Sequence, residues 1–263
     1  MADSTGMKGN LRAIRLKQMQ NYIAENGFVT IIQLCDKFGI SKNTVRADIR
    51  ELADKGFVQK KYGGVANIEQ NVMVSFTERQ STNMDLKEKI GIHAAQLLEE
   101  NDVICIDSGT TASCLMRAAT LFPPNITVIT NNFSVIQEAS KYPDVSVIVL
   151  PGKLERKTNS FVGVETIEAV KQYNFNKCFM GTTGISLSGC LTNSTTIEAK
   201  VKGEIIRNSK TCYLMACTSK LGQSNMVNFS NISQFTGWIC DSNDHDAAMS
   251  MGLKYGVKIL EVE

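Results

Sequence analysis

The sequence predicts an α/β fold in which a small, basic, helical domain precedes a larger domain of alternating helices and strands. Residues 8–62 hold eleven Lys and Arg against five Asp and Glu, whereas the rest of the chain holds 17 basic and 21 acidic residues. Apolar residues in the first part recur at three- and four-residue spacing, which is typical of amphipathic helices. From residue 86 onward, short Val- and Ile-rich runs alternate with amphipathic segments, which indicates a parallel sheet covered by helices on both faces.

The composition is typical of a globular protein. The chain has 263 residues, of which 43% are hydrophobic and 21% are charged, enough for one large or two modest domains. No apolar run approaches the roughly 18 residues of a membrane helix, and the N-terminus lacks the apolar segment of a secretion signal. Eight scattered cysteines without a C-x-x-C pair, and only two histidines, favour buried, reduced thiols. We therefore expect a cytoplasmic protein with no membrane association, no metal and no cofactor.

The first domain, expected over residues 8–64, contains three predicted helices. They cover residues 11–26, a short segment from Thr30 to Gly39, and 41–56. Their start and stop signals are Asn26-Gly27, Thr30, Gly39, Ser41 and Gly56. In the third helix, "SKNTVRADIRELADKG", a buried stripe is formed by Val45, Ile49, Leu52 and Ala53.

The second and third helices have the features of a helix-turn-helix. In that arrangement the second helix of the pair lies in the major groove of DNA. The stretch "FVQKKYGG" adds a hairpin wing. Asn43 and Arg46 suit contacts with base edges, whereas lysines suit phosphates. The predicted DNA-binding residues are Ser41, Lys42, Asn43, Thr44, Arg46, Arg50, Lys60 and Lys61. The sequence thus predicts a winged helix-turn-helix that binds double-stranded DNA.

The second domain is expected over residues 86–263, after a polar linker at 65–85. Its predicted helices cover 86–99, 111–121, 133–142, 163–173 and about 195–209. Its predicted strands cover 103–107, 126–130, 145–150, 177–181, 211–216, 236–240 and 257–262, with a last helix between the final two. Ligands of such sheets bind beyond the carboxyl ends of the strands.

Small polar residues follow four of these strands. "DSGTT" at 107–111 lies between a strand and a helix, where backbone N–H groups, hydroxyls and the helix dipole can converge on an anion. An ordinary capped turn is the alternative interpretation of this motif taken alone. Similar residues follow other strands in "TNN" at 130–132, "PGK" at 151–153 and "GTTG" at 181–184. Together they favour a phosphate-binding edge of the sheet.

The stretch "ISKNTVRADIRELADKGFVQKKYGG" resembles the N-terminal signature of the DeoR family of bacterial transcriptional regulators. The resemblance continues through "FTERQSTNMDLKEKIG", "ICIDSGTT", "TVITNN", "FMGTTGIS" and "EAKVK", and spans about residues 12 to 241. The chain departs from the family at Ala47, where an arginine is usual, at Pro151, where a glycine is usual, and at Cys217, where an acidic residue is usual. These departures leave the base contacts and the identity of the effector open.

The resemblance implies an effector domain that shares the fold of ribose-5-phosphate isomerase and binds a phosphorylated sugar or polyol. By motif position, the effector-binding residues would be Asp107, Ser108, Gly109, Thr110, Thr111, Thr130, Asn131, Gly152, Gly181, Gly184, Glu198, Lys202 and Lys220. The implied function is a repressor of a carbohydrate utilisation operon, with no catalytic activity. We expect a homo-oligomer, dimer or tetramer, because one small DNA-binding domain contacts too few base pairs for specific recognition in a genome.

Two other functions remain open at this point. An isomerase-like enzyme with an appended basic module would need a base such as Asp107 or Glu198. An RNA-binding or scaffolding protein would explain the charge but not the polar sheet edge. Cys217 in place of an acid weakens the enzymatic interpretation, and no histidine lies near it in sequence to make it a nucleophile. For a regulator, we expect effector binding to shift the population of two states and to change, through 65–85, the spacing of paired recognition helices.

Overall fold

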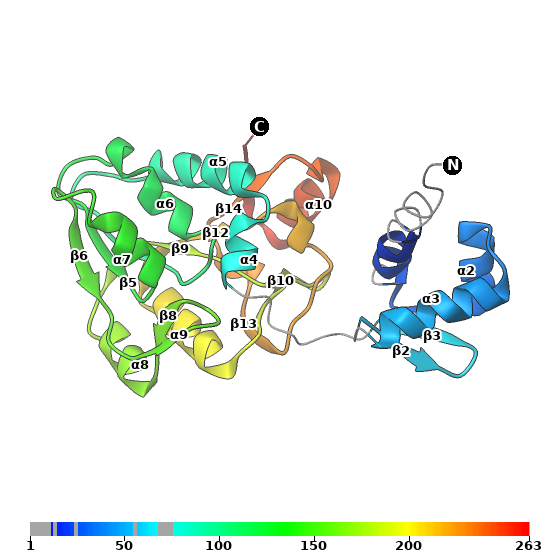
Figure 1. Ribbon diagram of the computed structural model, residues 1–263. Coiled ribbons are helices and arrows are strands. Elements are labelled where there is room, and N and C mark those ends of the chain that lie inside the picture. The colour runs from blue at the N-terminus through cyan, green and yellow to red at the C-terminus, as the bar shows by residue number, and fades with distance from the viewer. Residues whose placement is uncertain (1–11, 13–14, 24–25, 55–56, 68–75, 263) are drawn as a thin grey trace, which may run out of the picture. The chain divides into compact units, whose positions relative to one another are not determined.

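The chain divides between residues 70 and 71 into two units, each with its own hydrophobic core (Figure 1). The computed structural model describes residues 12, 15–23, 26–54, 57–67 and 76–262. The N-terminal unit contains the DNA-binding candidates and the C-terminal unit contains the effector-binding candidates.

The N-terminal unit is a winged helix-turn-helix. Its elements are a helical segment at residues 15–23, β1 (Phe28–Thr30), α2 (Ile31–Phe38), α3 (Lys42–Asp54), β2 (Val58–Lys61) and β3 (Gly64–Asn67). The strands form an antiparallel sheet in the order β1-β3-β2. Thr30 and Gln33 form a reciprocal capping box at the start of α2, and Gly39 ends it in the left-handed conformation with φ 63°. The predicted helix signals at Thr30 and Gly39 are confirmed.

The linker differs from its predicted bounds at both ends. β3 extends to Asn67, past Gly64, and its Ala66 pairs with Phe28 of β1 and with Gln59 of β2. On the other side, α4 (Phe76–Ser81) and the start of α5 (Met84–Ala95) fall within 65–85. α4 is short and polar, so the sequence did not mark it, whereas α5 begins two residues before the helix predicted over 86–99. Residues 68–75 lie outside the described residues.

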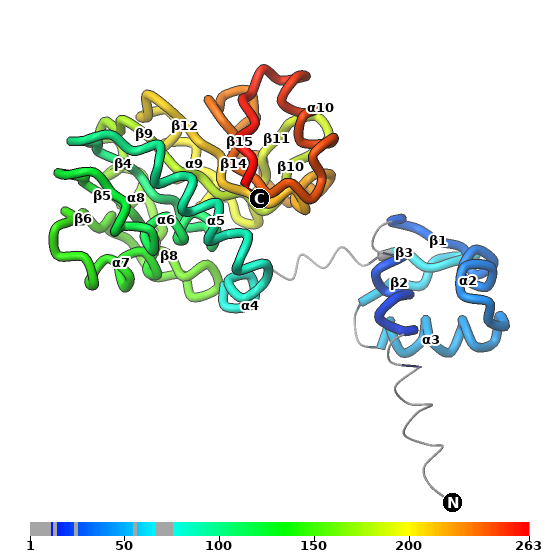
Figure 2. The backbone as a smooth tube through the Cα atoms, turned by 90° about the horizontal axis from the view of Figure 1, so that it is seen from above, coloured from blue at the N-terminus to red at the C-terminus, as the bar shows by residue number. Residues whose placement is uncertain are grey.

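The C-terminal unit is built on a seven-stranded sheet whose neighbouring strands are all parallel (Figure 2). Its order is β15-β14-β12-β9-β4-β5-β6. The strands are β4 (Val103–Ile106), β5 (Thr127–Thr130), β6 (Ser146–Val149), β9 (Phe175–Met180), β12 (Ser209–Met215), β14 (Gly237–Asp241) and β15 (Lys258–Val262). The predicted alternating α/β architecture is confirmed.

Helices cover both faces of this sheet. They are α5, α6 (Ser113–Arg117), α7 (Phe133–Ala139), α8 (Val164–Val170), α9 (Thr196–Arg207) and α10 (His245–Tyr255). Ile104 and Ile106 of β4 pack in one core with residues of α5, α6 and α7, whereas Cys105 packs in the other core with residues of α8, α9 and α10. Successive side chains of a strand point to opposite faces, which is why a continuous apolar run fits a sheet covered on both sides.

Smaller elements interrupt this pattern. They are the hairpin β7 (Lys153–Glu155) and β8 (Ser160–Val162), the antiparallel sheet β10 (Gly184–Ile185), β11 (Cys190–Asn193) and β13 (Val227–Asn231), and the 3-10 turns η1 (Ala119–Leu121), η2 (Thr218–Lys220) and η3 (Ile232–Gln234). The helix predicted over 111–121 is reduced to α6 followed by η1, so residues 107–112 form a longer turn after β4 than expected.

All eight cysteines are free thiols, and Cys35 and Cys190 are half-buried while the other six are buried. Among the residues that the structure describes, no helix combines the length and the apolar character needed to span a bilayer.

Candidate functional site

The outer face of α3 carries the predicted base-contacting residues. Val45, Ile49 and Leu52 are buried in the small core, which fixes the rotation of the helix about its axis. The residues between them, Ser41, Lys42, Asn43, Arg46, Ala47 and Arg50, are exposed, and Thr44 is half-buried. The Ser41 hydroxyl accepts the Thr44 N–H at 3.3 Å, which caps the helix as predicted. The basic face is thus presented to solvent along the first two turns of α3.

A buried carboxylate, which the sequence reasoning missed, attaches α3 to the first helical segment. Asp48 is 0% exposed and accepts hydrogen bonds from Arg15 Nε at 2.8 Å and Arg15 Nη2 at 3.3 Å. Arg12 Nε lies 3.5 Å from Asp48 Oδ1 and its Nη2 lies 2.7 Å from Glu51. The sign of this role in the sequence is that Asp48 is a polar residue within the apolar stripe of α3. Two arginines of the basic region therefore form ion pairs with carboxylates of α3.

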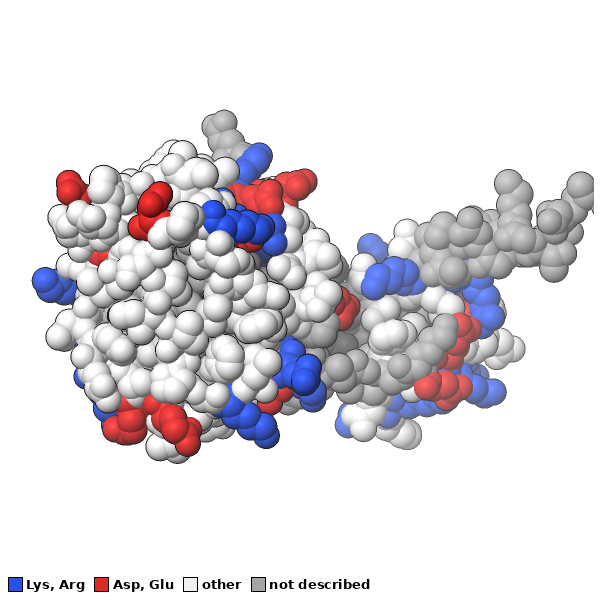
Figure 3. Space-filling model, turned by 60° about the vertical axis from the view of Figure 1, so that its left-hand side comes forward, with Lys and Arg blue, Asp and Glu red and all other residues white. Residues whose placement is uncertain are grey.

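The wing presents two further cations. Val58 of β2 is buried, while Lys60 and Lys61 are exposed. Gly63, at φ 79°, turns the hairpin, and Gly64 packs so closely on β1 that an added Cβ would lie 2.4 Å from the Val29 carbonyl oxygen. On the face drawn in Figure 3, Lys and Arg side chains lie at several places over this domain, next to a smaller acidic patch.

The effector-site candidates lie where the strand order of the large sheet reverses. From β4 the chain proceeds to β5 and β6 on one side, and then returns to β9 on the other side of β4. The turns that follow β4 and β9 are adjacent, and an added Cβ on Gly109 would lie 3.3 Å from the Gly181 Cα. A switch point of this kind is the usual ligand crevice of open α/β sheets.

Asp107 and Lys202 hold these two turns together. Asp107 Oδ2 accepts from the backbone N–H of Gly109 at 3.1 Å, from that of Gly181 at 3.0 Å, and from Lys202 Nζ at 2.5 Å. Lys202 Nζ also donates to the Gly181 carbonyl at 2.9 Å and lies 5.2 Å from the Phe229 ring centroid. Because Oδ2 of Asp107 accepts all three of these bonds from the protein, Asp107 acts as a positioning residue for the turn.

The turn itself offers unused donors. Within the described part of the chain, the backbone N–H groups of Ser108, Thr110 and Thr111 and the hydroxyls of Thr110 and Thr111 donate no hydrogen bond. Asn132 supports the turn, since its Nδ2 donates to the Asp107 carbonyl at 2.9 Å. These groups match the hydrogen-bonding needs of an oxyanion.

The end of β5 contributes one buried acceptor. Asn131 is 2% exposed and its Nδ2 donates to the Phe161 carbonyl at 2.9 Å, but its Oδ1 has no hydrogen-bond partner within the described residues. Thr130, by contrast, donates to the Ile106 carbonyl at 2.7 Å and accepts from the Asn132 N–H at 3.0 Å, so it is structural. A buried amide oxygen without a donor is rare and indicates a ligand hydroxyl or water.

Glu198, at the start of α9, is buried and already engaged. Its Oε2 accepts from Asn193 Nδ2 at 3.1 Å and from the Thr195 hydroxyl at 2.9 Å. Burial raises the pKa of Glu198, and the nearby positive charge of Lys202 opposes that rise.

Besides Lys202, three further basic residues belong to the elements around this edge of the sheet, and of these three the sequence reasoning named Lys220 alone. Lys220 follows β12 in η2, where burial lowers its pKa and the charge of Arg79 lowers it further. Arg79 of α4 and Lys87 of α5 were missed because both lie before the first strand of the sheet, near the predicted linker. Burial also lowers the pKa of Arg79 and of Lys87.

Two predicted glycines have packing roles. Gly152 is exposed, and an added Cβ would lie 2.4 Å from Thr166 Oγ1 of α8. Gly184 begins β10, where an added Cβ would lie 2.5 Å from the Gln223 carbonyl oxygen. The structure does not bring either residue into the hydrogen-bond network around Asp107.

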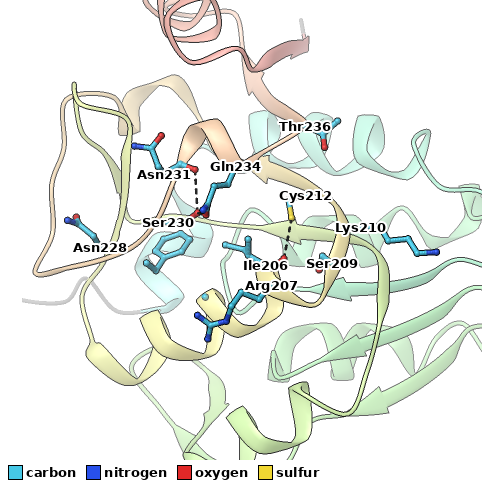
Figure 4. Close-up of a pocket in the computed structure, with 12 residues that line it drawn as sticks. Ile206, Arg207, Ser209, Lys210, Cys212, Asn228, Ser230, Asn231, Gln234 and Thr236 are labelled. Atoms are coloured by element: carbon cyan, nitrogen blue, oxygen red, sulfur yellow. Dashed lines mark hydrogen bonds between the residues drawn. The ribbon is translucent and has the colours of Figure 1, made fainter.

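A separate hollow of about 690 Å³ lies near the amino end of β12 (Figure 4). Side chains of α9, β12, β13 and η3 line it, including Arg207, Lys210, Asn228 and Gln234. It contains none of the predicted effector-binding residues. Among the described residues, no group of His, Cys, Asp and Glu is arranged to hold a metal ion.

Comparison with known families gives two matches along the chain. The model of the DeoR-like helix-turn-helix domain matches residues 15–71, and the model of the DeoR C-terminal sensor domain matches residues 82–242. Together they contain α3, the wing and the whole switch-point site.

Several curated proteins are similar over most of the chain. The HTH-type transcriptional regulator IolR of Bacillus subtilis is 39% identical over 83% of this chain and 87% of its own length. The lactose phosphotransferase system repressor of Streptococcus mutans is 30% identical over 88% and 93%. The glycerol-3-phosphate regulon repressor of Escherichia coli is 28% identical over 83% and 88%. Among solved structures, ribose 5-phosphate isomerase A of Methanocaldococcus jannaschii matches 53% of this chain and 55% of its own, with 18% identity and a TM-score of 0.38, which is too distant to bear on function.

Proposed function

Because this chain belongs to the DeoR family of transcriptional regulators, we propose that it represses a carbohydrate or polyol operon under the control of a phosphorylated effector. The effector is a phosphorylated sugar or polyol that binds at the switch point between β4 and β9. Its binding releases the protein from operator DNA. The observation that carries this proposal is the pairing, in one chain, of an exposed basic recognition helix with a sheet edge rich in unused donors.

The face of α3 supports the DNA half of the proposal. Asn43 and Arg46 are exposed, and their side chains can form bidentate hydrogen bonds with adenine and guanine. Lys42, Lys60 and Lys61 are exposed and suit phosphate contacts.

The sheet edge supports the effector half. The free N–H and hydroxyl groups of residues 108–111 suit a phosphoryl group, and the unpartnered Asn131 Oδ1 suits a hydroxyl of the same ligand. The names of two relatives point to the same chemistry, since they specify a glycerol-3-phosphate regulon and a lactose phosphotransferase system.

The protein is a regulator rather than an enzyme, as its relatives are named transcriptional regulators and repressors. The site chemistry agrees with this. Asp107 Oδ2 and Glu198 Oε2, on the two carboxylates that an enzymatic base would require, accept hydrogen bonds from the protein itself.

Control of DNA binding requires two states that the effector binds with different affinity. We expect a homo-oligomer that places two recognition helices on repeated or palindromic half-sites. In the effector-bound state their spacing no longer matches those half-sites.

The test is a fluorescence-anisotropy titration of the full chain on a labelled duplex from its own upstream region. The titration is repeated with a panel of sugar and polyol phosphates and with their unphosphorylated parents. One phosphorylated compound should weaken binding while its parent does not. If every compound leaves the curve unchanged, the effector half of the proposal is wrong.

The DNA half has its own matched pair of variants. Arg46→Ala should lose specific binding, whereas Lys17→Ala removes an exposed charge from the first helical segment of the same domain and should bind as the parent does. Equal binding of random DNA and operator by both variants and the parent would contradict the assigned recognition helix.

A further inference from the structure

Three cysteines lie side by side on the central strands of the large sheet. Cys178 of β9 is in register with Cys105 of β4 on one side and with Cys212 of β12 on the other. Residues in register on neighbouring parallel strands point to the same face of the sheet. All three side chains belong to the core that α8, α9 and α10 cover. These three cysteines are called the thiol row below.

Cys212 is the member of the row that solvent reaches. Cys105 and Cys178 are 0% exposed, whereas Cys212 is 6% exposed and lines the hollow near the amino end of β12. Its Sγ donates to the Ile206 carbonyl of α9 at 3.9 Å (Figure 4). The Thr236 N–H donates to the Cys212 carbonyl at 2.8 Å, which holds this part of β12 at the wall of the hollow. A small molecule that enters the hollow therefore meets Cys212 before the other two thiols.

The neighbouring thiol favours the reactive form of Cys212. A hydrogen bond with Cys178 lowers the pKa of the Cys212 thiol, and burial opposes this change. Burial raises the pKa of Cys178, and the same hydrogen bond raises it further. Cys212 therefore loses its proton more readily than Cys178 does. The thiolate is the nucleophilic form of cysteine, so the thiol that opens to the hollow is also the more reactive of the two.

The pair also has the spacing that a disulfide needs. Neighbouring strands of a sheet lie about 4.8 Å apart. Cysteines joined by a disulfide have Cα atoms about 4.4–6.8 Å apart. Because Cys178 and Cys212 are direct partners across β9 and β12, their sulfurs can be joined without moving either strand far.

We propose that Cys212 is an oxidation site for small hydroperoxides that enter the hollow, and that Cys178 converts the oxidised product to a disulfide. Redox-active cysteines of this kind are accessible thiols that lie next to a second, resolving thiol. A row of cysteines that only filled the core would need no opening at Cys212, because buried cysteine then serves as a small apolar side chain. The site contains none of the predicted effector-binding residues, so this inference does not depend on the proposed function.

The reaction balances with hydrogen peroxide as the oxidant. The Cys212 thiolate attacks one peroxide oxygen, the S–O bond forms, and the O–O bond breaks. The departing hydroxide takes up the proton that Cys212 released and becomes water, which leaves Cys212 as a sulfenic acid. The Cys178 sulfur then attacks the Cys212 sulfur, the S–S bond forms, and the S–O bond breaks. The second hydroxide takes the Cys178 proton, so two thiols are oxidised to a disulfide while the peroxide is reduced to two waters.

The other cysteines serve as internal references. Cys35 and Cys190 are half-buried and would react from the surface, so the test uses the full chain with Cys35→Ser and Cys190→Ser as its background. Cys114 and Cys217 are buried outside the thiol row, and burial raises the pKa of each. They should stay reduced under conditions that oxidise Cys212.

The test treats this folded background protein with hydrogen peroxide, alkylates the remaining thiols in denaturant and maps the peptides by mass spectrometry without reduction. A linked pair of peptides containing Cys178 and Cys212 should appear, lacking two hydrogen atoms, and it should disappear after treatment with dithiothreitol. The proposal is overturned if no such pair forms, if it forms only when urea is present during oxidation, or if Cys178 is joined to Cys105 instead.

Three variants of the same background assign the roles. Cys178→Ala should stop the reaction at the Cys212 sulfenic acid, which dimedone traps as a covalent adduct. Cys212→Ala should leave Cys178 reduced, because Cys178 does not reach the hollow. Cys105→Ala is the matched control, since it removes the other neighbour of Cys178, and it should form the same disulfide as the background protein. A dimedone adduct on Cys178 in the Cys212→Ala variant would overturn the assignment of Cys212 as the attacking thiol.

Discussion

Lys202 Nζ lies 2.5 Å from Asp107 Oδ2, and both side chains are almost completely buried. The pair joins α9 to the turn after β4, and through the Gly181 contacts it also fixes the turn after β9. Residues that the sequence nominated as ligand contacts thus form the support on which the binding turn is built. Removing a supporting charge and removing a ligand contact have different consequences, which experiments can separate.

Breaking this pair should destabilise the protein strongly. Asp107→Asn leaves the Lys202 ammonium buried without its counterion. Lys202→Met leaves the Asp107 carboxylate buried without its counterion. Each should lower the free energy of unfolding by about 3–5 kcal/mol. The double variant should lose less than the sum of the two. Urea denaturation measures all four proteins, and strictly additive losses would show that the pair is not coupled.

Asp48 should contribute to the stability of the small N-terminal domain alone. Asp48→Asn removes the charge that holds Arg15 and Arg12, and should cost the small domain about 1.5–3 kcal/mol. The chain has one tryptophan, Trp238, which is buried in the large domain. Far-UV circular dichroism should therefore show an earlier transition in the variant, while Trp238 fluorescence should follow the parent curve. A shift of both signals together would contradict independent domain stability.

The wing lysines should contribute to affinity through phosphates. Lys60→Gln should make the plot of log affinity against log salt less steep by about one, with equal losses on operator and on random duplex. Lys17→Gln is the control because Lys17 lies outside the wing and outside α3. An effect confined to the operator would instead indicate that Lys60 reads bases.

The buried thiols predict a loss of stability at alkaline pH. Burial raises the pKa of Cys114 to about 11 and that of Cys217 to about 11, above the ordinary value of 9.0. Between these values the unfolded chain loses thiol protons that the folded chain retains. The contribution of each thiol is therefore fully present below pH 9 and is lost as the pH rises toward 11. Between pH 8 and pH 10.5, the melting temperature should fall less in the Cys217→Ala variant than in the parent. An equal fall in both proteins would contradict this assignment.

Much of the local structure was accessible from the sequence. Thr30, Gly39 and Ser41 act through backbone groups within a few residues, so their capping roles are visible in the chain itself. The apolar runs of the large domain likewise required a sheet covered on both faces. The short strands β7, β8, β10 and β11 were missed because two to four residues carry too little period to distinguish a strand from a loop.

The candidate site was less completely predicted. "TNN" identified the end of β5, but nothing in the motif separates Asn131, whose Oδ1 is unpartnered, from Asn132, whose amide supports the Asp107 turn. Arg79 and Lys87 have no motif at all in the local pattern. That they are neighbours follows only from tertiary packing, in which Lys87 Nζ of α5 donates to the Arg79 carbonyl of α4.

The sequence by itself determined the helix-turn-helix, the α/β class and the polar strand ends, because these depend on the spacing of residues near one another in the chain. Only the tertiary structure decided that Asp107 faces Lys202, 95 residues away, and that Lys87 donates to the backbone carbonyl of Arg79. The physical reason is that a parallel sheet collects the ends of distant strands along one edge. The order of its strands is set by long-range packing, which no local pattern records.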